Sequence, residues 1–383
     1  MDQIPYALPL IEDEEIKEVL DTLHSNWLSK GPKTVEFEKQ FSDYVNSNFA
    51  IGLNSCTAGL HISQLAAGIG PGDEVITTPY TFVASANTII HTGAKPVFVD
   101  IDPVTMNIDP SKIEEKITDR TKAIIPVHFA GYPCDMDPIL EIAKKHNLVV
   151  IEDAAHAVYT QYKGRMVGSI SDFTCFSFYA TKNLVTGEGG MVTTNSEEMA
   201  DKLRVMSLHG MSKNAWNRYS GKGSWFYEVE YPGFKYNMTD MQAALGLVQM
   251  KKLQSMQEKR ESIAKIYNEA FSKIEGIITP YDNAENVHAW HLYVIRLKED
   301  NFTIDRAEFI EKLKEKGIGT SVHFIPVPMH PYYKQQGYRI EDYPNALEAY
   351  NGAISIPLYP KMSHEQVMRV VEAVEELAQI YKK

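Results

Sequence analysis

The chain has 383 residues, of which 44% are hydrophobic and 23% are charged, so it can bury one large core and a second, smaller one. Its formal net charge of −12 argues against a protein that wraps nucleic acid, because that function needs a basic face. No signal peptide is recognisable, and no run approaches the roughly 18 apolar residues of a membrane helix, so we expect a soluble, cytoplasmic protein without a membrane partner.

Strand-like and helix-like segments alternate from about residue 48 to residue 195. The helical patterns between the strands include Ala58–Ala67 and Pro138–Lys145. Strands that alternate with helices of this length predict an α/β fold with a mostly parallel sheet covered on both faces. The runs that we predict to be strands are Phe49–Leu53, Glu74–Thr78, Pro96–Val99, Ala123–Val127, Leu148–Ile151, Phe173–Phe178 and Met191–Thr194.

A long helical pattern follows, from about Thr239 to Ile274, with an apolar stripe and no proline. A helix of this length in a globular enzyme often connects two domains, and we place a domain boundary within it. We predict a large domain from residue 1 to 245, with an N-terminal arm over about residues 1–30, and a small α+β domain from residue 246 to 383. The small domain is expected to contain the strands Leu292–Leu297 and Thr320–Phe324 and the helices Asp305–Lys316 and His364–Tyr381.

Lys182 stands in a polar turn between an apolar strand and a glycine cluster. A lysine in a loop is usually a solvated charge, but this one follows a strand end of an α/β sheet, where ligand sites gather. A lysine in a partly desolvated site has a lowered pKa, which frees its amine to attack a carbonyl group. Lys182 is therefore our candidate for the amine that holds a carbonyl cofactor.

Asp153 stands at the end of another apolar strand. A carboxylate at this place commonly caps the following helix. Close to Lys182 it would have a second role, because a carboxylate beside a pyridine nitrogen keeps that nitrogen protonated and lets the ring withdraw electrons from a substrate carbanion.

Two further segments follow strand ends. At Ser55, Cys56 and Thr57, small residues lead from a strand into a helix, whose free N–H groups can bind a phosphate, although an ordinary N-cap would look the same. Phe82 follows another strand and can cover the face of a ring, although an aromatic residue there is more often part of the core. With Lys182 and Asp153, these segments predict one site on one side of the sheet.

The chain resembles the DegT/DnrJ/EryC1/StrS family of nucleotide-sugar aminotransferases, which are fold-type I enzymes that use pyridoxal 5'-phosphate. The resemblance covers nearly the whole chain. The segments that carry it are Gly31–Lys33, Ser55–Ala58, Gly70–Val75, Pro126–Gly131, Glu152–His156, Ser177–Lys182, Gly187–Gly190, His209–Gly210, Tyr236–Asp240, His288–Tyr293, His323–Phe324 and Ile356–Pro360.

The resemblance implies a role for each matching residue. Lys182 would form the internal aldimine and later shuttle a proton, Asp153 would pair with the pyridine nitrogen, and His156 would lie near the phenolic oxygen or the ring. The remaining implied contacts to the cofactor are Phe82 stacked on the ring, the backbone of Cys56 and Thr57 with the Ser177 hydroxyl on the phosphate, and Asn237 reaching that phosphate from the neighbouring subunit. The resemblance thus also implies a homodimer with shared active sites.

Within the family, the chain looks closest to enzymes that act on UDP-linked 4-keto sugars, in particular those that make UDP-4-amino-4-deoxy-L-arabinose. The implied reaction moves an amino group from L-glutamate to C4 of the sugar. Tyr179 departs from the family, where many members have His, and the stretch from Ile325 to Tyr338 departs from this subgroup. Candidates for contacts to the sugar or its diphosphate are Lys30, Arg218 and His323, each of which can equally be a solvated surface group.

Three alternatives remain to be weighed. A 3-keto sugar aminotransferase acting on a dTDP-sugar fits the same family. A non-catalytic, cofactor-binding regulator of the same fold is disfavoured because Lys182, Asp153 and Ser177 are retained; some dehydratase relatives carry His in place of the lysine. An NAD-dependent oxidoreductase is disfavoured because the glycines of residues 68–72 precede a strand, the reverse of the dinucleotide-binding context.

The three cysteines, Cys56, Cys134 and Cys175, lie far apart and without metal-type spacing. We expect them to be reduced thiols, mostly buried, and we expect no metal site.

Overall fold

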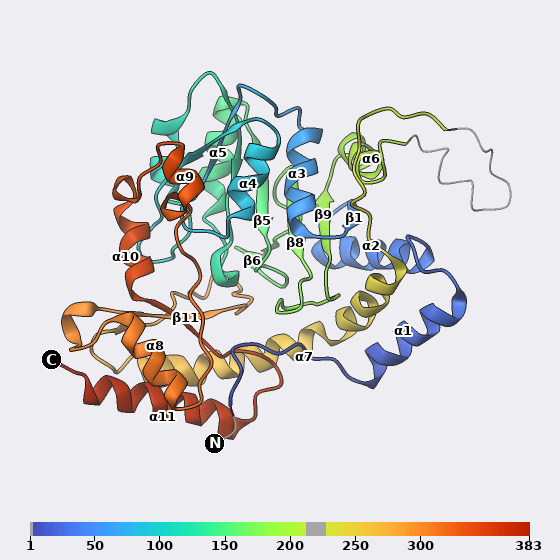
Figure 1. Cartoon of the computed structure of the whole chain (residues 1–383). Helices are drawn as coiled ribbons and strands as arrows, with labels where there is room; N and C mark the ends of the chain where they lie inside the picture. The colour runs from blue at the N-terminus through green and yellow to red at the C-terminus, as the bar shows by residue number, and fades with distance from the viewer. Residues whose placement is uncertain (1–2, 212–226) are drawn as a thin grey trace.

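The computed structural model describes residues 3–211 and 227–383 (Figure 1). Its centre is a seven-stranded sheet in the order β1-β9-β8-β5-β4-β2-β3. Strand β9 runs antiparallel to both of its neighbours, and the other six strands of the sheet all point in one direction. The sheet is therefore mostly parallel, as predicted. The strands are β1 (Phe49–Leu53), β2 (Glu74–Thr77), β3 (Lys95–Phe98), β4 (Thr121–Ile125), β5 (Val149–Ala154), β8 (Phe173–Ser177) and β9 (Gly190–Thr194).

Strand β5 continues three residues beyond the predicted end at Ile151. The backbone of Asp153 donates to the carbonyl of Pro126 at 2.8 Å and accepts from the backbone of His128 at 3.1 Å. These bonds extend the pairing with the chain that follows β4, because a backbone N–H or C=O buried in a sheet must find a partner. Asp153 therefore lies within a strand rather than after one.

Helices cover both faces of the central sheet (Figure 1). Ile151 of β5 packs with α3 (Cys56–Ala66) and α6 (Glu197–Met206), whereas Val150, one residue earlier, packs with α5 (Met136–His146) on the opposite face. This alternation follows from the two-residue period of a strand. Since Asp153 lies two residues after Ile151, it faces the α3 side of the sheet.

The long helix α7 (Asp240–Phe271) links the two parts of the molecule (Figure 1). It begins with a capping box, in which Thr239 and Gln242 each bind the backbone of the other. Its residues up to Met256 pack beside α2 (Pro32–Val45), and those from Ile263 onward belong to the core of the C-terminal part. The domain boundary at residues 245/246 stays a prediction; the packing partners of α7 change further along the helix.

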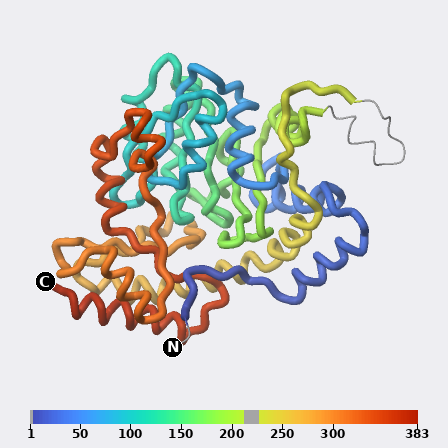
Figure 2. The backbone as a smooth tube through the Cα atoms, viewed as in Figure 1, coloured from blue at the N-terminus to red at the C-terminus, as the bar shows by residue number. Residues whose placement is uncertain are grey.

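The smaller part is built on a three-stranded antiparallel sheet in the order β10-β11-β12, and its core includes side chains of α8 and α11. The start of the chain also lies here, because Ile4 pairs with Ile318 (Figure 2). No helix among residues 3–211 and 227–383 is both long and apolar enough to cross a membrane. The remaining helices and strands are α1 (Asp13–Ser25), α4 (Ala84–His91), β6 (Gln161–Tyr162), β7 (Arg165–Met166), β10 (Ile277–Ile278), β11 (Tyr293–Leu297), α8 (Arg306–Glu315), α9 (Pro331–Gln335), α10 (Pro344–Gly352), β12 (Ala353–Ile356) and α11 (His364–Ile380).

The prediction of a strand at Thr320–Phe324 is wrong, because these residues form no strand. Only Ser321 pairs with a strand residue, Ser355 of β12, through two backbone hydrogen bonds of 3.0 and 2.8 Å. The backbone carbonyl of His323 binds outside the smaller sheet, since it accepts from the Tyr80 hydroxyl at 2.8 Å. The segment therefore leaves the sheet after one residue pair.

Candidate active site

A cavity of about 450 Å³ lies at the carboxyl ends of the parallel strands. Such an edge is where α/β sheets commonly bind ligands. It brings together nine of the residues predicted from the sequence, namely Ser55, Cys56, Thr57, Phe82, Asp153, His156, Ser177, Lys182 and His323. The other residues that line it are Tyr6, Leu60, Ala84, Ala155, Tyr179, Thr181, Glu188, Gly189, His291 and Phe324.

Lys182 extends into this cavity from the turn that follows β8. Its backbone N–H donates to the carbonyl of Tyr179 at 2.9 Å, and its Nζ lies 3.5 Å from Nε2 of His291. Burial lowers the pKa of the Lys182 amine to about 8, although Cys56 and Asp153 oppose the shift. A substantial fraction of this amine is thus neutral near pH 7 to 8, the form that attacks a carbonyl group.

Asp153 lines the same cavity, and its side chain is buried, with 5% of the residue exposed. The Ser85 hydroxyl donates to its Oδ2 at 2.7 Å, and the backbone N–H of Ala155 donates to its Oδ1 at 3.2 Å. Burial raises the pKa of this carboxyl group, and these hydrogen bonds together with the charge of Lys182 act against the rise. A cationic partner inside the cavity would favour the ionised carboxylate further.

The start of α3 lines the cavity and has the geometry of an anion site. Ser55 is the N-cap, and its hydroxyl accepts from the backbone of Ala58 at 3.1 Å. The N–H groups of Cys56 and Thr57 belong to the first turn, where an α-helix has no internal acceptors for them. The start of α3 packs closely against Gly190 of β9. A Cβ atom at Gly190 would lie 2.5 Å from the backbone nitrogen of Cys56, so a larger residue would not fit there.

His156 also lines the cavity, and its ring is stacked on Phe324 at 5.8 Å between centroids. The backbone N–H of Ala130 donates to its Nδ1 at 3.2 Å. Burial holds the pKa of His156 well below its usual range, and Lys182 and His323 lower it further. The ring is therefore neutral, with its hydrogen on Nε2 and available for donation.

Phe82 and Tyr179 border the cavity and remain largely exposed, at 58% and 47%. The Phe82 ring lies 5.8 Å from that of Phe324. The His323 ring is positioned by Ser355 of β12, whose hydroxyl lies 2.8 Å from its Nδ1. Burial and the charge of Lys182 lower the pKa of His323 to about 4, so its ring is neutral too.

Two of the predicted residues are described by the structure and do not line this cavity. Lys30 forms an ion pair with Glu38 at 2.8 Å. Asn237 is buried beside β1, and its Oδ1 accepts from Lys235 at 2.7 Å. Arg218 lies outside the described residues.

The residues that sequence reasoning missed include Ser85, Asn183 and His291. Ser85 lies three residues after Phe82, in the first turn of α4, so the segment that supplied Phe82 was a usable signal. His291 belongs to the His288–Tyr293 motif, but it precedes a strand of the smaller sheet, and no local pattern places it beside Lys182.

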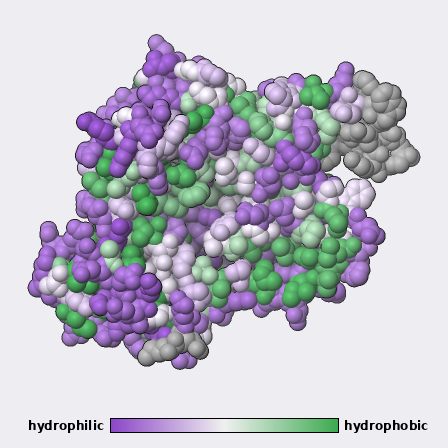
Figure 3. All heavy atoms as spheres, in the orientation of Figure 1, coloured by the Kyte–Doolittle hydropathy of each residue, from purple (hydrophilic) through white to green (hydrophobic). Residues whose placement is uncertain are grey.

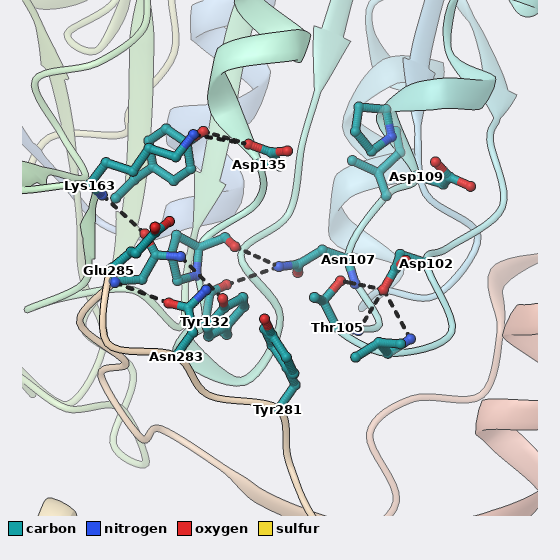
Figure 4. A pocket seen from close by; sticks show the side chains of 16 residues that line it. Asp102, Thr105, Asn107, Asp109, Tyr132, Asp135, Lys163, Tyr281, Asn283 and Glu285 are labelled. Atoms are coloured by element: carbon teal, nitrogen blue, oxygen red, sulfur yellow. Dashed lines mark hydrogen bonds and ion pairs between the residues drawn. The ribbon is translucent and has the colours of Figure 1, made fainter.

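A second cavity, of about 500 Å³, shares no lining residue with the first (Figure 4). Four carboxylates line it, those of Asp102, Asp109, Asp135 and Glu285. Its lysine, Lys163, is exposed and pairs with Asp137 at 2.9 Å, and hydrogen bonds with Tyr162 and Asp137 raise its pKa. A protonated amine among carboxylates suits neither attack on a carbonyl group nor binding of a phosphate.

All three cysteines are free and buried, as expected. Burial raises the pKa of Cys56, which lines the active-site cavity, well above its usual value. The thiol is therefore protonated and does not compete with Lys182 as a nucleophile.

The first cavity fits pyridoxal phosphate in each of its functional groups. Lys182 could supply an amine for the aldehyde, Asp153 a buried carboxylate for the pyridine nitrogen, and the first turn of α3 an N–H cluster for the phosphate. The carboxylate is the most informative of these three groups, because a buried negative charge is costly unless a cationic partner lies beside it.

Comparisons with known proteins agree with this chemistry. A model of the DegT/DnrJ/EryC1/StrS aminotransferase family matches residues 9–375. The chain is 60% identical over 376 residues to the spore coat polysaccharide biosynthesis protein SpsC of Bacillus subtilis (strain 168), covering 98% of this chain and 97% of that protein.

Solved structures are similar over the whole chain. The putative sugar aminotransferase Spr1654 from Streptococcus pneumoniae, in its PMP form, has a TM-score of 0.93 at 37% identity, covering 99% of this chain and 98% of that one. Helicobacter pylori PseC, an aminotransferase involved in the biosynthesis of pseudoaminic acid, has a TM-score of 0.93 at 30% identity, covering 99% and 100%. The chain therefore belongs to the DegT/DnrJ/EryC1/StrS family and is a sugar aminotransferase that depends on pyridoxal phosphate.

Proposed function

We propose that this enzyme moves an amino group from L-glutamate to a keto carbon, C4, of a UDP-linked sugar. Amino transfer is supported above all by one observation: the buried amine of Lys182, with a pKa of about 8, shares a cavity with the Asp153 carboxylate and the start of α3. The C4 position and the UDP group are supported by the resemblance of the segments around His156, Asn237 and His291 to enzymes of that specificity.

We assign roles to the residues of the cavity on the same basis. Pyridoxal phosphate, when bound, supplies an electron sink for the negative charge that develops on the substrate carbon. Lys182 holds the carbonyl of the cofactor and then, as a free amine, takes a proton from the glutamate carbon and returns one to the sugar carbon. Asp153 keeps the pyridine nitrogen protonated, and the backbone of Cys56 and Thr57 with the Ser177 hydroxyl binds the phosphate.

The remaining residues of the cavity are proposed to contact the ring of the cofactor or the sugar. His156 would donate from Nε2 to the phenolic oxygen, and Phe82 would cover one face of the ring. His323 and Tyr179 line the same cavity as Lys182 and are proposed to contact the sugar. The roles of Lys30 and Arg218 toward the sugar or its diphosphate stay predictions.

A panel of sugars tests the proposal. The purified protein is loaded with pyridoxamine phosphate and mixed with UDP- and dTDP-linked sugars that carry a keto group at C3 or C4. We expect the UDP-linked 4-keto sugar to return the cofactor to its aldehyde form fastest, as recorded by absorbance, and L-glutamate to regenerate the amine with release of 2-oxoglutarate. A response to the dTDP-linked 3-keto sugar alone would support the alternative specificity, and no response at all would contradict sugar amination.

We also propose that the protein is a homodimer with shared active sites. Several large apolar side chains of α1 and the turn after it are exposed, and apolar surface gathers over α1 (Figure 3). They are Ile16, Leu20, Leu23, Trp27 and Leu28. A contiguous apolar surface of this kind marks a protein interface. Asn237, which does not line the cavity of its own chain, is proposed to reach the phosphate in the partner.

Mixing two inactive variants tests the shared site. Lys182→Ala and Asn237→Ala are each expected to lose activity, about tenfold or more for the second because it removes a hydrogen bond to a charged group. In a symmetric dimer, one site of each hybrid keeps both residues, so a hybrid should have about half of the normal activity. About half of the dimers in a random equal mixture are hybrids, so the mixture should regain about a quarter of the normal activity. Activity that stays at the average of the two variants would place Asn237 in its own subunit's site, and a monomer in analytical ultracentrifugation would rule out sharing.

A further inference from the structure

His291 reaches the active-site cavity from the smaller part of the molecule. The segment that carries it is fixed to the turn at residues 129–131, which follows β4. The backbone N–H of His291 donates to the carbonyl of Ala130 at 3.0 Å, and that of Ala289 donates to the carbonyl of Gly131 at 3.0 Å. The His291 side chain is buried, and its Nε2 lies 3.5 Å from Nζ of Lys182, although 109 residues separate the two in sequence. Backbone hydrogen bonds therefore hold the segment of His291 in place, and its side chain lies next to the amine of Lys182.

The hydrogen-bond chain behind His291 determines which ring nitrogen carries the hydrogen. The carbonyl oxygen of Ala289 can only accept, so the Asn183 side-chain atom 2.6 Å from it must be the amide nitrogen. The amide oxygen of Asn183 is then the atom 3.1 Å from Nδ1 of His291, and it also can only accept. His291 therefore carries its hydrogen on Nδ1 and offers a lone pair at Nε2 to Lys182.

The neighbouring imidazole has the opposite arrangement. The rings of His156 and His291 lie 4.4 Å apart between centroids. His156 accepts at Nδ1 from the backbone of Ala130, so its hydrogen is on Nε2. Of these two histidines, only His291 can accept a hydrogen bond from Lys182 through Nε2.

We propose that His291, fixed by Asn183, is a positioning residue that accepts a hydrogen bond from the amine of Lys182 and so directs the lone pair of that amine toward the substrate carbon. This inference rests on the proposed role of Lys182 as proton carrier. The other titratable groups that act on Lys182 or on His291 are Cys56, Asp153, His156, His323 and Arg260. Among the described residues, none of these groups hydrogen-bonds to Nζ of Lys182, which is the contact that His291 makes.

The proposal predicts a shift in the titration of Lys182. An acceptor stabilises the ammonium form, so its loss should lower the pKa of the amine. We compare His291→Leu, which removes the acceptor, with His291→Gln, whose side-chain oxygen can take the place of Nε2. A merely structural role would make the two variants alike.

The measurement is the rate at which the cofactor-free protein captures pyridoxal phosphate covalently, followed by absorbance across a pH series. The inflection of this profile reports the fraction of neutral Lys182 amine. For His291→Leu we expect the inflection about one pH unit lower than in the unchanged protein, as for the loss of one hydrogen bond to a charged group. For His291→Gln we expect it near the original value. The kcat of His291→Leu should fall about tenfold, with little change in KM.

His288→Leu is the matched control. His288 lies on the same segment and is equally buried, but its Nδ1 accepts from the backbone of Trp290 at 2.9 Å and it does not line the cavity. This variant should lower the unfolding temperature and leave the inflection unchanged. Should His291→Leu not fold, Asn183→Ala takes its place, since it frees the ring and should lower the inflection in the same direction.

An inflection that stays in place in His291→Leu, or that shifts equally in His291→Gln or His288→Leu, would overturn the positioning role. The proposed function would fail differently: the unchanged protein itself would show no covalent capture, or would capture the cofactor without aminating any sugar.

Discussion

Replacement of Lys182 by alanine should abolish covalent capture of pyridoxal phosphate and lower kcat by about four orders of magnitude, the upper range for the loss of a positioned proton carrier. Among residues 3–211 and 227–383, no other lysine lines the cavity, so none of the described lysines can take its place. The variant should still bind the cofactor non-covalently through the start of α3 and Asp153. Absorbance spectra for the bound form and turnover with a keto sugar check the two effects.

Lys163→Ala is the control for this experiment. Lys163 lies in the other cavity, where its amine is exposed and paired with Asp137, so its loss should change neither the spectrum nor kcat. A visible band of lysine-bound cofactor that persists in Lys182→Ala and disappears in Lys163→Ala would show that the wrong lysine has been assigned.

Asp153→Asn should lower kcat by about a hundredfold to a thousandfold while leaving the fold intact, the second large effect that we expect. The amide has the shape of the carboxylate but no charge, so it cannot keep a pyridine nitrogen protonated. Its amide oxygen can accept from the backbone N–H of Ala155, and its amide nitrogen can donate to the Ser85 hydroxyl oxygen, which preserves the local packing. Steady-state kinetics at saturating substrate and thermal unfolding, measured side by side, separate activity from stability.

Glu152→Gln, one residue earlier, should instead lower the stability of the protein and leave kcat almost unchanged. Glu152 faces the other side of the sheet, where its carboxylate accepts from His128 at 2.8 Å, from Ser171 at 2.6 Å and from Thr174 at 2.8 Å. Removing its charge should destabilise the protein by about 3 kcal/mol, as for a broken buried pair, with little change in kcat of the folded enzyme. Equal losses of kcat in the two variants would contradict the assignment of Asp153 as the carboxylate that contacts the cofactor.

The stability that Glu152 contributes depends on pH in a defined direction. Burial by itself would raise the pKa of Glu152, but the hydrogen bonds from His128, Ser171 and Thr174 outweigh burial and leave the pKa below its ordinary value. Its contribution is therefore complete above the pKa of the unfolded chain and is lost as the pH falls through the lower pKa of the folded state.

The central sheet could be predicted closely from sequence because each strand is a short apolar run bounded by turn residues. All seven predicted strands are present, with ends that agree within three residues. The prediction failed where pairing partners decide the structure: β5 continues through Asp153 because the chain after β4 supplies backbone partners, and Thr320–Phe324 is not a strand because only Ser321 finds one.

Much of the active site was also accessible from the sequence. Parallel strands share a carboxyl edge, so polar residues near several strand ends must converge, and Ser55, Phe82, Asp153 and Lys182 line one cavity for this reason. The same reasoning did not exclude Lys30, whose ion pair with Glu38 depends on how α2 packs against β1.

The amine of Lys182, its place after a strand and its distance along the chain from Asp153 are properties of the sequence alone. Its lowered pKa and its contact with His291 were decided only by the tertiary structure. Burial depends on every segment that closes over the cavity, and His291 comes from a segment 109 residues away that is fixed by backbone hydrogen bonds to Ala130 and Gly131. No local pattern encodes contacts of that range, because they form only when the two parts of the molecule pack together.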